Sequence, residues 1–254
     1  MPADPRPTLF LSDLHLSPDR PEALAAFDAF AAGPARAAAA VYILGDLFDW
    51  WVGDDQMADP FVAKIVASLA AIRAAGVPLF VGRGNRDFML GERFAAASGA
   101  TLLPDFVVVN AGGVRTLLCH GDELCTDDTE YQAYRARVRN PETQARLLRL
   151  PYFARRALAW WLRRKSRNDK ALKAESIMDV ATGAVEEAFR THGVTRMIHG
   201  HTHRPARHEH AVDGTGRERF VLADWYDRGQ YLAADADGIH VREVKGQTLN
   251  MTPA

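Results

Sequence analysis

Five short blocks rich in aspartate, asparagine and histidine punctuate this chain, and each lies at or just after an apolar, strand-like run. The blocks occupy residues 12–15, 45–49, 84–87, 119–122 and 199–203. In chain order they supply Asp, His, Asp, Asn, His, His and His. Side chains of these types bind hard or borderline divalent ions through oxygen and imidazole nitrogen, and the set is large enough for two ions.

The strand-like runs alternate with helical stretches in the first half of the chain. The runs are Thr8–Leu11, Val41–Leu44, Val77–Val81, Phe106–Val109 and Thr116–Cys119. Alanine-rich stretches at residues 22–32 and 61–75 indicate helices, the second of them closed by Gly76. This alternation predicts an α/β layered fold with its site at the carboxyl ends of the strands.

The pattern becomes mostly helical after Asp122, from about residue 128 to residue 190, with breaks at Pro141 and Pro151. We interpret residues 125–173 as a helical insert in a single domain of 254 residues. Strand-like pieces resume beyond the insert, and we expect them to form a second, more antiparallel sheet. These pieces are residues 196–198, 218–223, 230–234 and 239–244.

Charge is distributed unevenly along a chain whose formal net charge is only −1. Residues 131–170 carry twelve Arg and Lys against two acidic residues, and aromatic side chains such as Trp160 and Trp161 lie among the cations. A solvated helix face is the ordinary interpretation of such a run. Cations mixed with exposed aromatic residues are also typical of a segment that lies on an anionic membrane surface.

Two further features bear on location. Cys119 and Cys125 are the two cysteines, and the N-terminal residues contain no apolar signal-like stretch, so we expect reduced thiols and a cytosolic location. Arg155 and Arg156 interrupt the most hydrophobic segment, and no apolar run is long enough to span a bilayer.

Each candidate ligand has an ordinary explanation when it is considered alone. Asp46 is a strand-end residue of the kind that caps a turn, Asn85 suits a turn, and His120 suits a buried core position. His199 is the weakest candidate of the last block and is more consistent with a structural role. The occurrence of all five blocks in similar strand-then-loop contexts favours a metal site over these separate explanations.

The order of the blocks and the residues within them resemble those of the calcineurin-like metallophosphoesterases, in which the blocks read D-x-H, G-D, G-N-H-[DE], H and G-H-x-H. This resemblance implies a layered α-β-β-α sandwich and two divalent ions that activate water and neutralise charge at phosphorus. Asp46 would bridge the ions, one held also by Asp13, His15 and His203, and the other by Asn85, His120 and His201. Asp87 and Asp122 are candidates for orienting these ligands.

Arg86 departs from the general pattern, which has histidine at this position of the third block. A histidine can protonate an alkoxide leaving group, whereas arginine stays charged near neutral pH and binds phosphate oxygens instead. A phosphate leaving group needs no such proton, because its second pKa lies near 6. We therefore expect a pyrophosphate substrate and catalytic roles for Asp46, Asn85, Arg86 and His120.

Residues 45–55, the Asn85-Arg86 pair and residues 198–205 resemble more closely the UDP-2,3-diacylglucosamine diphosphatase family of bacterial lipid A biosynthesis. The resemblance implies hydrolysis to UMP and 2,3-diacylglucosamine 1-phosphate, water attacking the α-phosphorus, and Mn²⁺ as the metal. It also implies a helical lid over the acyl chains that engages the cytosolic face of the inner membrane as a peripheral protein. Substrate contacts carried over are Asn85, Arg86, Asp128, Ser166, Lys170, Lys173 and His201.

Two other interpretations stay open at the level of the sequence. A nucleotide pyrophosphatase of broad range would need no apolar lid. A metal-bound scaffold that grips RNA or a protein partner through the basic segment would need no complete set of ligands for two ions. The near-neutral net charge gives no reason to expect a nucleic-acid partner.

Overall fold

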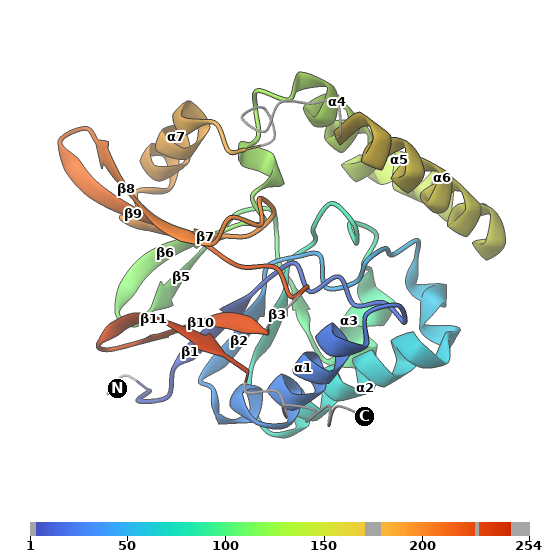
Figure 1. Ribbon diagram of the computed structural model, residues 1–254, viewed down its shortest axis with the longest axis horizontal. Helices are drawn as coiled ribbons and strands as arrows, with labels where there is room; N and C mark the ends of the chain where they lie inside the picture. The colour runs from blue at the N-terminus through green and yellow to red at the C-terminus, as the bar shows by residue number, and fades with distance from the viewer. Residues whose placement is uncertain (1–3, 171–178, 227–228, 245–254) are drawn as a thin grey trace, which may run out of the picture.

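Two β-sheets lie face to face in the computed structural model, which describes residues 4–170, 179–226 and 229–244 (Figure 1). The first sheet contains, in spatial order, β11 (Gly238–Glu243), β10 (Gln230–Asp235), β1 (Thr8–Leu11), β2 (Ala40–Ile43), β3 (Leu79–Val81) and β4 (Thr101–Leu102). The second contains, in spatial order, β5 (Val107–Ala111), β6 (Val114–Leu118), β7 (Arg196–His199), β9 (Thr215–Val221) and β8 (Ala206–Val212).

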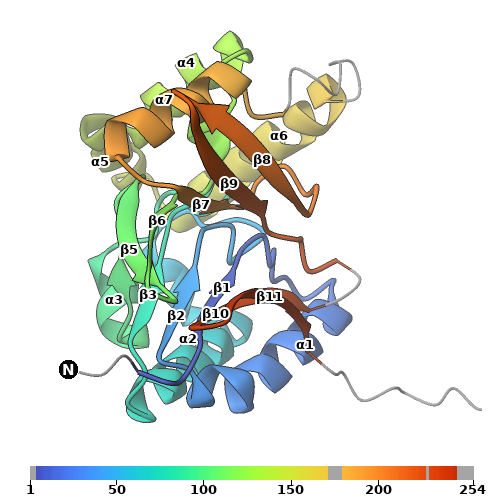
Figure 2. The same cartoon turned by 90° about the vertical axis from the view of Figure 1, so that its left-hand side faces the viewer.

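Helices cover the outer faces of both sheets (Figure 2). The helices are α1 (Pro21–Ala32), α2 (Pro60–Ala74), α3 (Glu92–Ser98), α4 (Thr129–Arg139), α5 (Pro141–Leu148), α6 (Tyr152–Lys170) and α7 (Thr182–His192). Short 3₁₀ turns are η1 (Pro34–Ala37), η2 (Asp54–Ala58) and η3 (Asp122–Leu124). The helices predicted at residues 22–32 and 61–75 are confirmed as α1 and α2, and Gly76 closes α2 with a φ of 83°.

Three apolar clusters define the layers. One lies between the sheets and joins Phe10 of β1 to Ile198 of β7 and Leu232 of β10. A second fills the space between the first sheet and α1 to α3, and a third packs Phe189 of α7 against the second sheet. The predicted layered α-β-β-α sandwich is therefore confirmed, and its inner strands β1, β7 and β10 are buried on both of their faces.

Two strands lie in a different sheet from the one that we predicted from the sequence. We expected residues 230–234 and 239–244 in the second sheet, whereas β10 and β11 extend the first sheet, with β10 antiparallel to β1. β10 is buried on both faces, because Leu232 points between the sheets and Ala233 points toward the helices. Such a strand needs a neighbour on each edge, and strand propensity alone cannot tell which sheet provides it.

Where the structure describes the segment between β6 and β7, it is mostly helical, as predicted. α5 begins at Pro141, α6 begins one residue beyond Pro151, and α4 to α6 extend beyond the edge of the sandwich (Figure 1). Several large apolar side chains of this segment face solvent, among them Phe153, Trp160 and Trp161, which are 75%, 60% and 54% exposed. Within the described ranges, no helix combines the length and the apolar character needed to cross a bilayer.

Both cysteines are buried free thiols, which agrees with the expectation of reduced cysteines. Burial raises the pKa of Cys119 well above its ordinary value and that of Cys125 to about 12. Because the thiolate is the reactive form, alkylation by iodoacetamide at about pH 8 should be at least ~10-fold slower in the folded protein than after unfolding. Intact-mass spectrometry over time measures this, and rapid labelling of the folded chain would contradict it.

Candidate metal centre and adjoining cavity

The predicted ligand blocks meet where the ends of both sheets converge. The loops that follow β1 and β2 are joined by the Asp13 amide donating to Gly45 O (3.1 Å) and the His15 amide donating to Asp46 O (2.9 Å). Across the two sheets, the His201 amide donates to Oδ2 of Asp13 at 2.8 Å. The loops are thus fixed to one another by hydrogen bonds before any ion is considered.

Left-handed backbone is concentrated at this point. Five candidate ligands have a left-handed backbone, with φ between 47° and 69°: Asp13, His15, Asp46, His201 and His203. Among the described non-glycine residues, the other with positive φ is Asp213, in the turn between β8 and β9. A left-handed backbone at a non-glycine residue costs ~1–3 kcal/mol of conformational free energy, and it is kept only where the surrounding structure enforces it. This clustering of backbone strain marks the centre as a functional site.

One group of ligand atoms is formed by Asp13, His15 and His203, whose atoms lie close enough to share one ion. Nε2 of His203 is 3.2 Å from Oδ1 of Asp13 and 3.4 Å from Nε2 of His15. The Asp13 and His15 side chains are 0% and 2% exposed, and that of His203 is 28% exposed. A cation placed between these atoms would find one carboxylate oxygen and two imidazole nitrogens.

Asp46 lies between this group and a second one. Its Oδ2 is 3.8 Å from Nε2 of His15, and its Oδ1 is 3.9 Å from Nε2 of His120. Oδ1 of Asn85 in turn lies 3.1 Å from Nε2 of His120 and 3.0 Å from Nδ1 of His201. The structure therefore brings all seven predicted ligands together, with one Asp46 oxygen directed toward each group.

The histidine tautomers suit metal binding. Nδ1 of His120 is 2.9 Å from Leu44 O, and because a carbonyl only accepts, this nitrogen carries a proton, so Nε2 is the nitrogen that faces the ligand group. Nδ1 of His203 is likewise 3.1 Å from Oδ2 of Asp224. A carbonyl or carboxylate behind the ring is the ordinary partner of a metal-ligating histidine.

The electrostatics of the ligand groups also fit bound cations. Burial, together with the neighbouring Asp87 and Asp13 carboxylates, outweighs the lowering effect of His120 and raises the pKa of Asp46 to about 7. Burial lowers the pKa of His120, but the carboxylates of Asp46 and Asp13 outweigh it and bring the pKa to about 9. Buried carboxylates this close together need positive charge nearby, which divalent ions would supply.

Asp87 holds the loops that carry Asp46 and Asn85. Its carboxylate accepts hydrogen bonds from the amides of Asp46 (3.2 Å), Leu47 (2.8 Å) and Gly84 (2.8 Å). The orienting role that we predicted for Asp87 is thus visible as contacts to backbone. Asp122, the other predicted orienting residue, accepts from the Tyr131 hydroxyl at 2.6 Å and from Arg135 at 3.0 Å.

Gly84 is the point at which this packing leaves no room for a side chain. A Cβ there would overlap Oδ1 of Asp46. We expect Gly84→Ala to displace the Asp46 carboxylate and weaken divalent-metal binding at least ~10-fold, the effect of losing a group that holds a ligand. Calorimetric titration with Mn²⁺ measures the loss. Gly183→Ala is the matched control, since a Cβ at Gly183 meets no atom within 4 Å; equal binding by both variants would contradict the prediction.

His199 has the structural role that its sequence context favoured. It is fully buried at the end of β7, with Nε2 3.0 Å from a guanidinium nitrogen of Arg219 and Nδ1 2.9 Å from Gly200 O. Burial and the Arg219 charge lower the pKa of His199 to about 3. The ring stays neutral and takes no part in either ligand group.

A cavity of about 700 Å³ opens from the metal centre. At its polar end are Asn85, Arg86 and His201, and the amide of Arg86 donates to Oδ1 of Asp46 at 2.8 Å. Its other walls are mainly apolar and come from the 50–52 loop, residues 88–89 and helices α4 to α6. The apolar residues are Trp50, Trp51, Val52, Phe88, Met89, Leu147, Leu158, Ala159 and Leu162.

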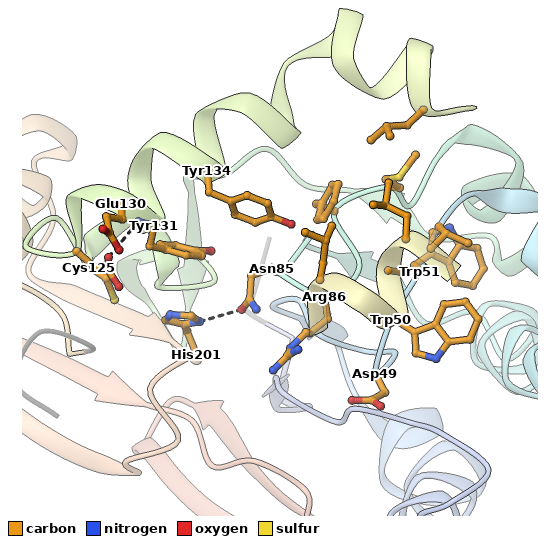
Figure 3. A pocket seen from close by; sticks show the side chains of 18 of the residues that line it. Asp49, Trp50, Trp51, Asn85, Arg86, Cys125, Glu130, Tyr131, Tyr134 and His201 are labelled. Atoms are coloured by element: carbon orange, nitrogen blue, oxygen red, sulfur yellow. Dashed lines mark hydrogen bonds between the residues drawn. The ribbon is translucent and has the colours of Figure 1, made fainter. Parts of the chain in front are cut away.

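Figure 3 shows how the two ends of the cavity connect. Asn85 lies in the middle, His201 and Tyr131 lie on one side of it, and Trp50 and Trp51 lie on the other. Arg86 projects between Asn85 and Asp49. A ligand with a phosphate at the metal centre would therefore extend directly into apolar surroundings.

The predicted substrate contacts divide into two sets. Asn85, Arg86, Asp128 and His201 all line the cavity. Ser166 and Lys170 lie on the last turns of α6, where the structure describes the backbone alone, and Lys173 lies outside the described residues. Their predicted contacts stay predictions.

Sequence reasoning missed several residues around the first ligand group. Asp224 contacts His203, and the Tyr226 ring stacks on His15 at 5.4 Å between centroids. The guanidinium carbon of Arg20 lies 3.9 Å from the centroid of the Tyr226 ring. A signal existed for Asp224, because it follows the apolar run at the end of β9 as the other ligand blocks follow theirs. Nothing in the sequence distinguishes Arg20 or Tyr226 from ordinary surface residues.

The fold and the ligand set together define a metal-dependent phosphoesterase. The chain belongs to the calcineurin-like phosphoesterase family, whose model matches residues 6–205. Membership of this family implies bound divalent metal ions, and the two groups of ligand atoms described above fit them. The protein is therefore a metal-dependent hydrolase.

Several sequence relatives of this chain are named for one particular substrate. The chain is similar to the UDP-2,3-diacylglucosamine hydrolases of Cellvibrio japonicus (48% identity, covering 92% of this chain and 98% of that one) and Aromatoleum aromaticum (49%, covering 91% and 94%). It is 46% identical to the enzyme of the same name from Escherichia coli K12, covering 92% of this chain and 97% of that one. Among solved structures, an archaeal phosphodiesterase matches with a TM-score of 0.45, at 14% identity and covering 93% of this chain and 98% of that one.

Proposed function

We propose that this protein hydrolyses the pyrophosphate bond of UDP-2,3-diacylglucosamine to UMP and 2,3-diacylglucosamine 1-phosphate, a step of lipid A biosynthesis. Water attacks the α-phosphorus in this proposal, and two divalent ions, most simply Mn²⁺, are the cofactors. The near full-length similarity to three hydrolases named for this substrate supports the assignment. The observation that carries it is the single cavity joining the metal centre to apolar walls.

The cavity matches the substrate in chemistry. A molecule with a diphosphate in its middle and two acyl chains on one side needs a polar centre next to a large apolar space. About 700 Å³ lined mainly by aromatic and aliphatic side chains, with Asn85, Arg86 and His201 at one end, provides that combination. A soluble dinucleotide would leave most of the apolar wall in contact with water.

The metal ions would be held as the two ligand groups indicate. Asp13, His15 and His203 would bind one ion and Asn85, His120 and His201 the other, with Asp46 between them. Bound divalent ions lower the pKa of water and neutralise charge at phosphorus. Asp87, Asp224 and Leu44 O would keep the ligands oriented through the hydrogen bonds described above.

Arg86 would act on the phosphate rather than on a proton. Its backbone is tied to Asp46, and its side chain lines the polar end of the cavity. A guanidinium there neutralises and orients phosphate oxygens through a fork of N–H groups but cannot protonate a leaving group. This suits a phosphate leaving group and disfavours alkoxide leaving groups such as those of phosphoserine.

Residues 125–173 would serve as a lid that also meets the membrane. α5 and α6 supply the apolar roof of the cavity, including Leu147, Leu158 and Leu162. Phe153, Trp160 and Trp161 are exposed beside arginines such as Arg156 and Arg164, which suits the interface of an anionic bilayer. We propose that the protein works as a peripheral enzyme on the cytosolic face of the inner membrane, with no nucleic-acid partner.

Hydrolysis in water enriched with oxygen-18 tests the assignment directly. The purified protein, Mn²⁺ and UDP-2,3-diacylglucosamine should give UMP that carries the label, detected by the isotope shift of its phosphorus NMR signal. Label in the sugar phosphate instead would contradict attack at the α-phosphorus. Absence of turnover, together with rapid cleavage of soluble dinucleotides, would replace the proposal by a nucleotide pyrophosphatase of broad range.

A further inference from the structure

Helix α4 is attached to the backbone that precedes Asn85. The Arg139 guanidinium donates from one nitrogen to Arg83 O (3.0 Å) and to Gly84 O (3.2 Å). These carbonyls belong to the two residues immediately before Asn85 in the loop after β3. The position of the Asn85 amide therefore depends on a side chain of a helix that begins more than 40 residues later.

The same helix is attached to the loop that follows His120. Nε of Arg135 donates to Oδ2 of Asp122 at 3.0 Å, and a terminal nitrogen of Arg135 donates to Oε1 of Glu123 at 3.1 Å. The Tyr131 hydroxyl adds its hydrogen bond to Asp122. Glu123 also accepts from the Gly121 amide at 2.8 Å, so these contacts reach the residue next to His120.

Asp105 links the two arginines. Its Oδ2 accepts from Arg135 at 2.7 Å and its Oδ1 from Arg139 at 2.9 Å. The arginine side chains are 15% and 13% exposed, Asp122 at the inner end is fully buried, and Asp105 at the outer end is 43% exposed. An ion network that is buried at one end is costly to break, since removing one partner leaves the other charged and unpaired.

We propose that Arg135 and Arg139 are positioning residues, and that α4 is a clamp that holds Asn85 and His120 at the separation required by the second metal ion. The inference rests on the proposed function in one respect, that Asp46, Asn85, His120 and His201 bind an ion. Asn85 is the ligand most in need of such support, because a neutral amide oxygen attracts a cation less than a carboxylate does. No comparable clamp from α4 contacts Asp13, His15 or His203 among the contacts of the described residues.

Metal titration of arginine variants tests the clamp. Arg139→Ala should weaken Mn²⁺ binding about 10- to 100-fold at one of two sites and leave the other within about two-fold, the range seen when a ligand's supporting group is lost. Arg139→Lys keeps a cation that can reach a carbonyl and should recover part of the affinity. Arg137→Ala is the matched control, because Arg137 is an exposed arginine of the same helix.

Electron paramagnetic resonance separates positioning from general destabilisation. Two Mn²⁺ ions in neighbouring sites give an exchange-coupled spectrum, so wild-type and Arg137→Ala protein with two equivalents of metal should both show it. Arg139→Ala should show mainly the six-line spectrum of isolated Mn²⁺. Coupled spectra in all three proteins, or equal loss at both sites, would overturn the clamp.

A less disruptive substitution tests the clamp if Arg139→Ala does not fold. Asp105→Asn leaves both arginines in place and removes the carboxylate that they share, and it should weaken the second site by a smaller factor, about 3- to 10-fold. Unchanged binding in a folded Asp105→Asn protein would count against the clamp. Wild-type protein that binds two ions but does not cleave the UDP-linked lipid would refute the proposed function alone, whereas wild-type protein that binds one ion would refute the clamp.

Discussion

Asp46→Asn should reduce hydrolysis of the pyrophosphate substrate at least ~1,000-fold while the protein stays folded. Asp46 is fully buried, and its two oxygens face His15 and His120 at 3.8 and 3.9 Å, so it is the side chain shared by both ligand groups. Loss of its charge weakens the binding of both ions at once. Losses of catalytic rate of this size are ordinary when one group of a catalytic unit is removed.

Asparagine is preferred to alanine at this position for a structural reason. Asp46 has a φ of 52°, a conformation that asparagine tolerates better than alanine. Asp46→Ala should therefore lose stability as well as activity, whereas Asp46→Asn isolates the loss of charge. Asp28→Asn, at a partly exposed position of α1 that pairs with Lys64 far from the ligand groups, is the control for removing one carboxylate.

Turnover and metal content together decide this prediction. Initial rates are measured at saturating Mn²⁺, metal per chain by atomic emission, and folding by thermal unfolding. A folded Asp46→Asn protein that hydrolyses the substrate within about ten-fold of the wild-type rate would contradict a mechanism in which both ions share this carboxylate.

Local sequence was sufficient for much of the fold and for selecting the seven candidate ligands that the structure brings together. The strand runs and helices were found because apolar periodicity and glycine stops act within one segment. Asp13, Asp46, Asn85 and His120 were found for a related reason, since each lies directly after a strand, where parallel strands place their ends at one edge of a sheet. Their meeting point follows from the fold class rather than from the details of packing.

Interactions between distant segments were beyond sequence reasoning. β10 has the burial of an inner strand, but its pairing with β1 depends on which edge is open after the other strands have assembled. Arg135 and Arg139 were counted among the cations of a basic segment, whereas the structure gives both of them buried partners and places Arg155 with Asp55 and Val52 O. A cation's partners depend on which loops lie within reach, and a charge count contains no such information.

This finding divides the basic segment into two functional parts. Arg135 and Arg139 of α4 face inward and donate to the loops around the ligand groups, while the exposed aromatic and basic residues of α6 face outward. Deleting the whole segment would therefore damage metal binding and acyl recognition together. A single charge placed in the cavity roof separates the two, because it leaves α4 and its contacts intact.

Leu158→Asp should lower kcat/KM for UDP-2,3-diacylglucosamine about 100-fold and leave cleavage of a short, soluble UDP-sugar within about two-fold. Leu158 lines the cavity from α6, and an acyl chain bound there would bury the new carboxylate without a partner, at a cost of several kcal/mol. The metal centre contacts no part of α6 in the hydrogen bonds described, so the chemistry itself should be retained.

Ala157→Asp provides the matched control, since it adds the same charge one residue earlier in α6 at an exposed position. Rates are compared with the lipid presented in mixed detergent micelles, so that a changed affinity for a bilayer does not enter. A large loss confined to Leu158→Asp and to the lipid substrate would show that the apolar cavity receives the acyl chains. Equal losses on both substrates, or equal losses in both variants, would mean that the cavity does not discriminate by acyl chain, and the case for a lipid substrate would then depend on sequence similarity alone.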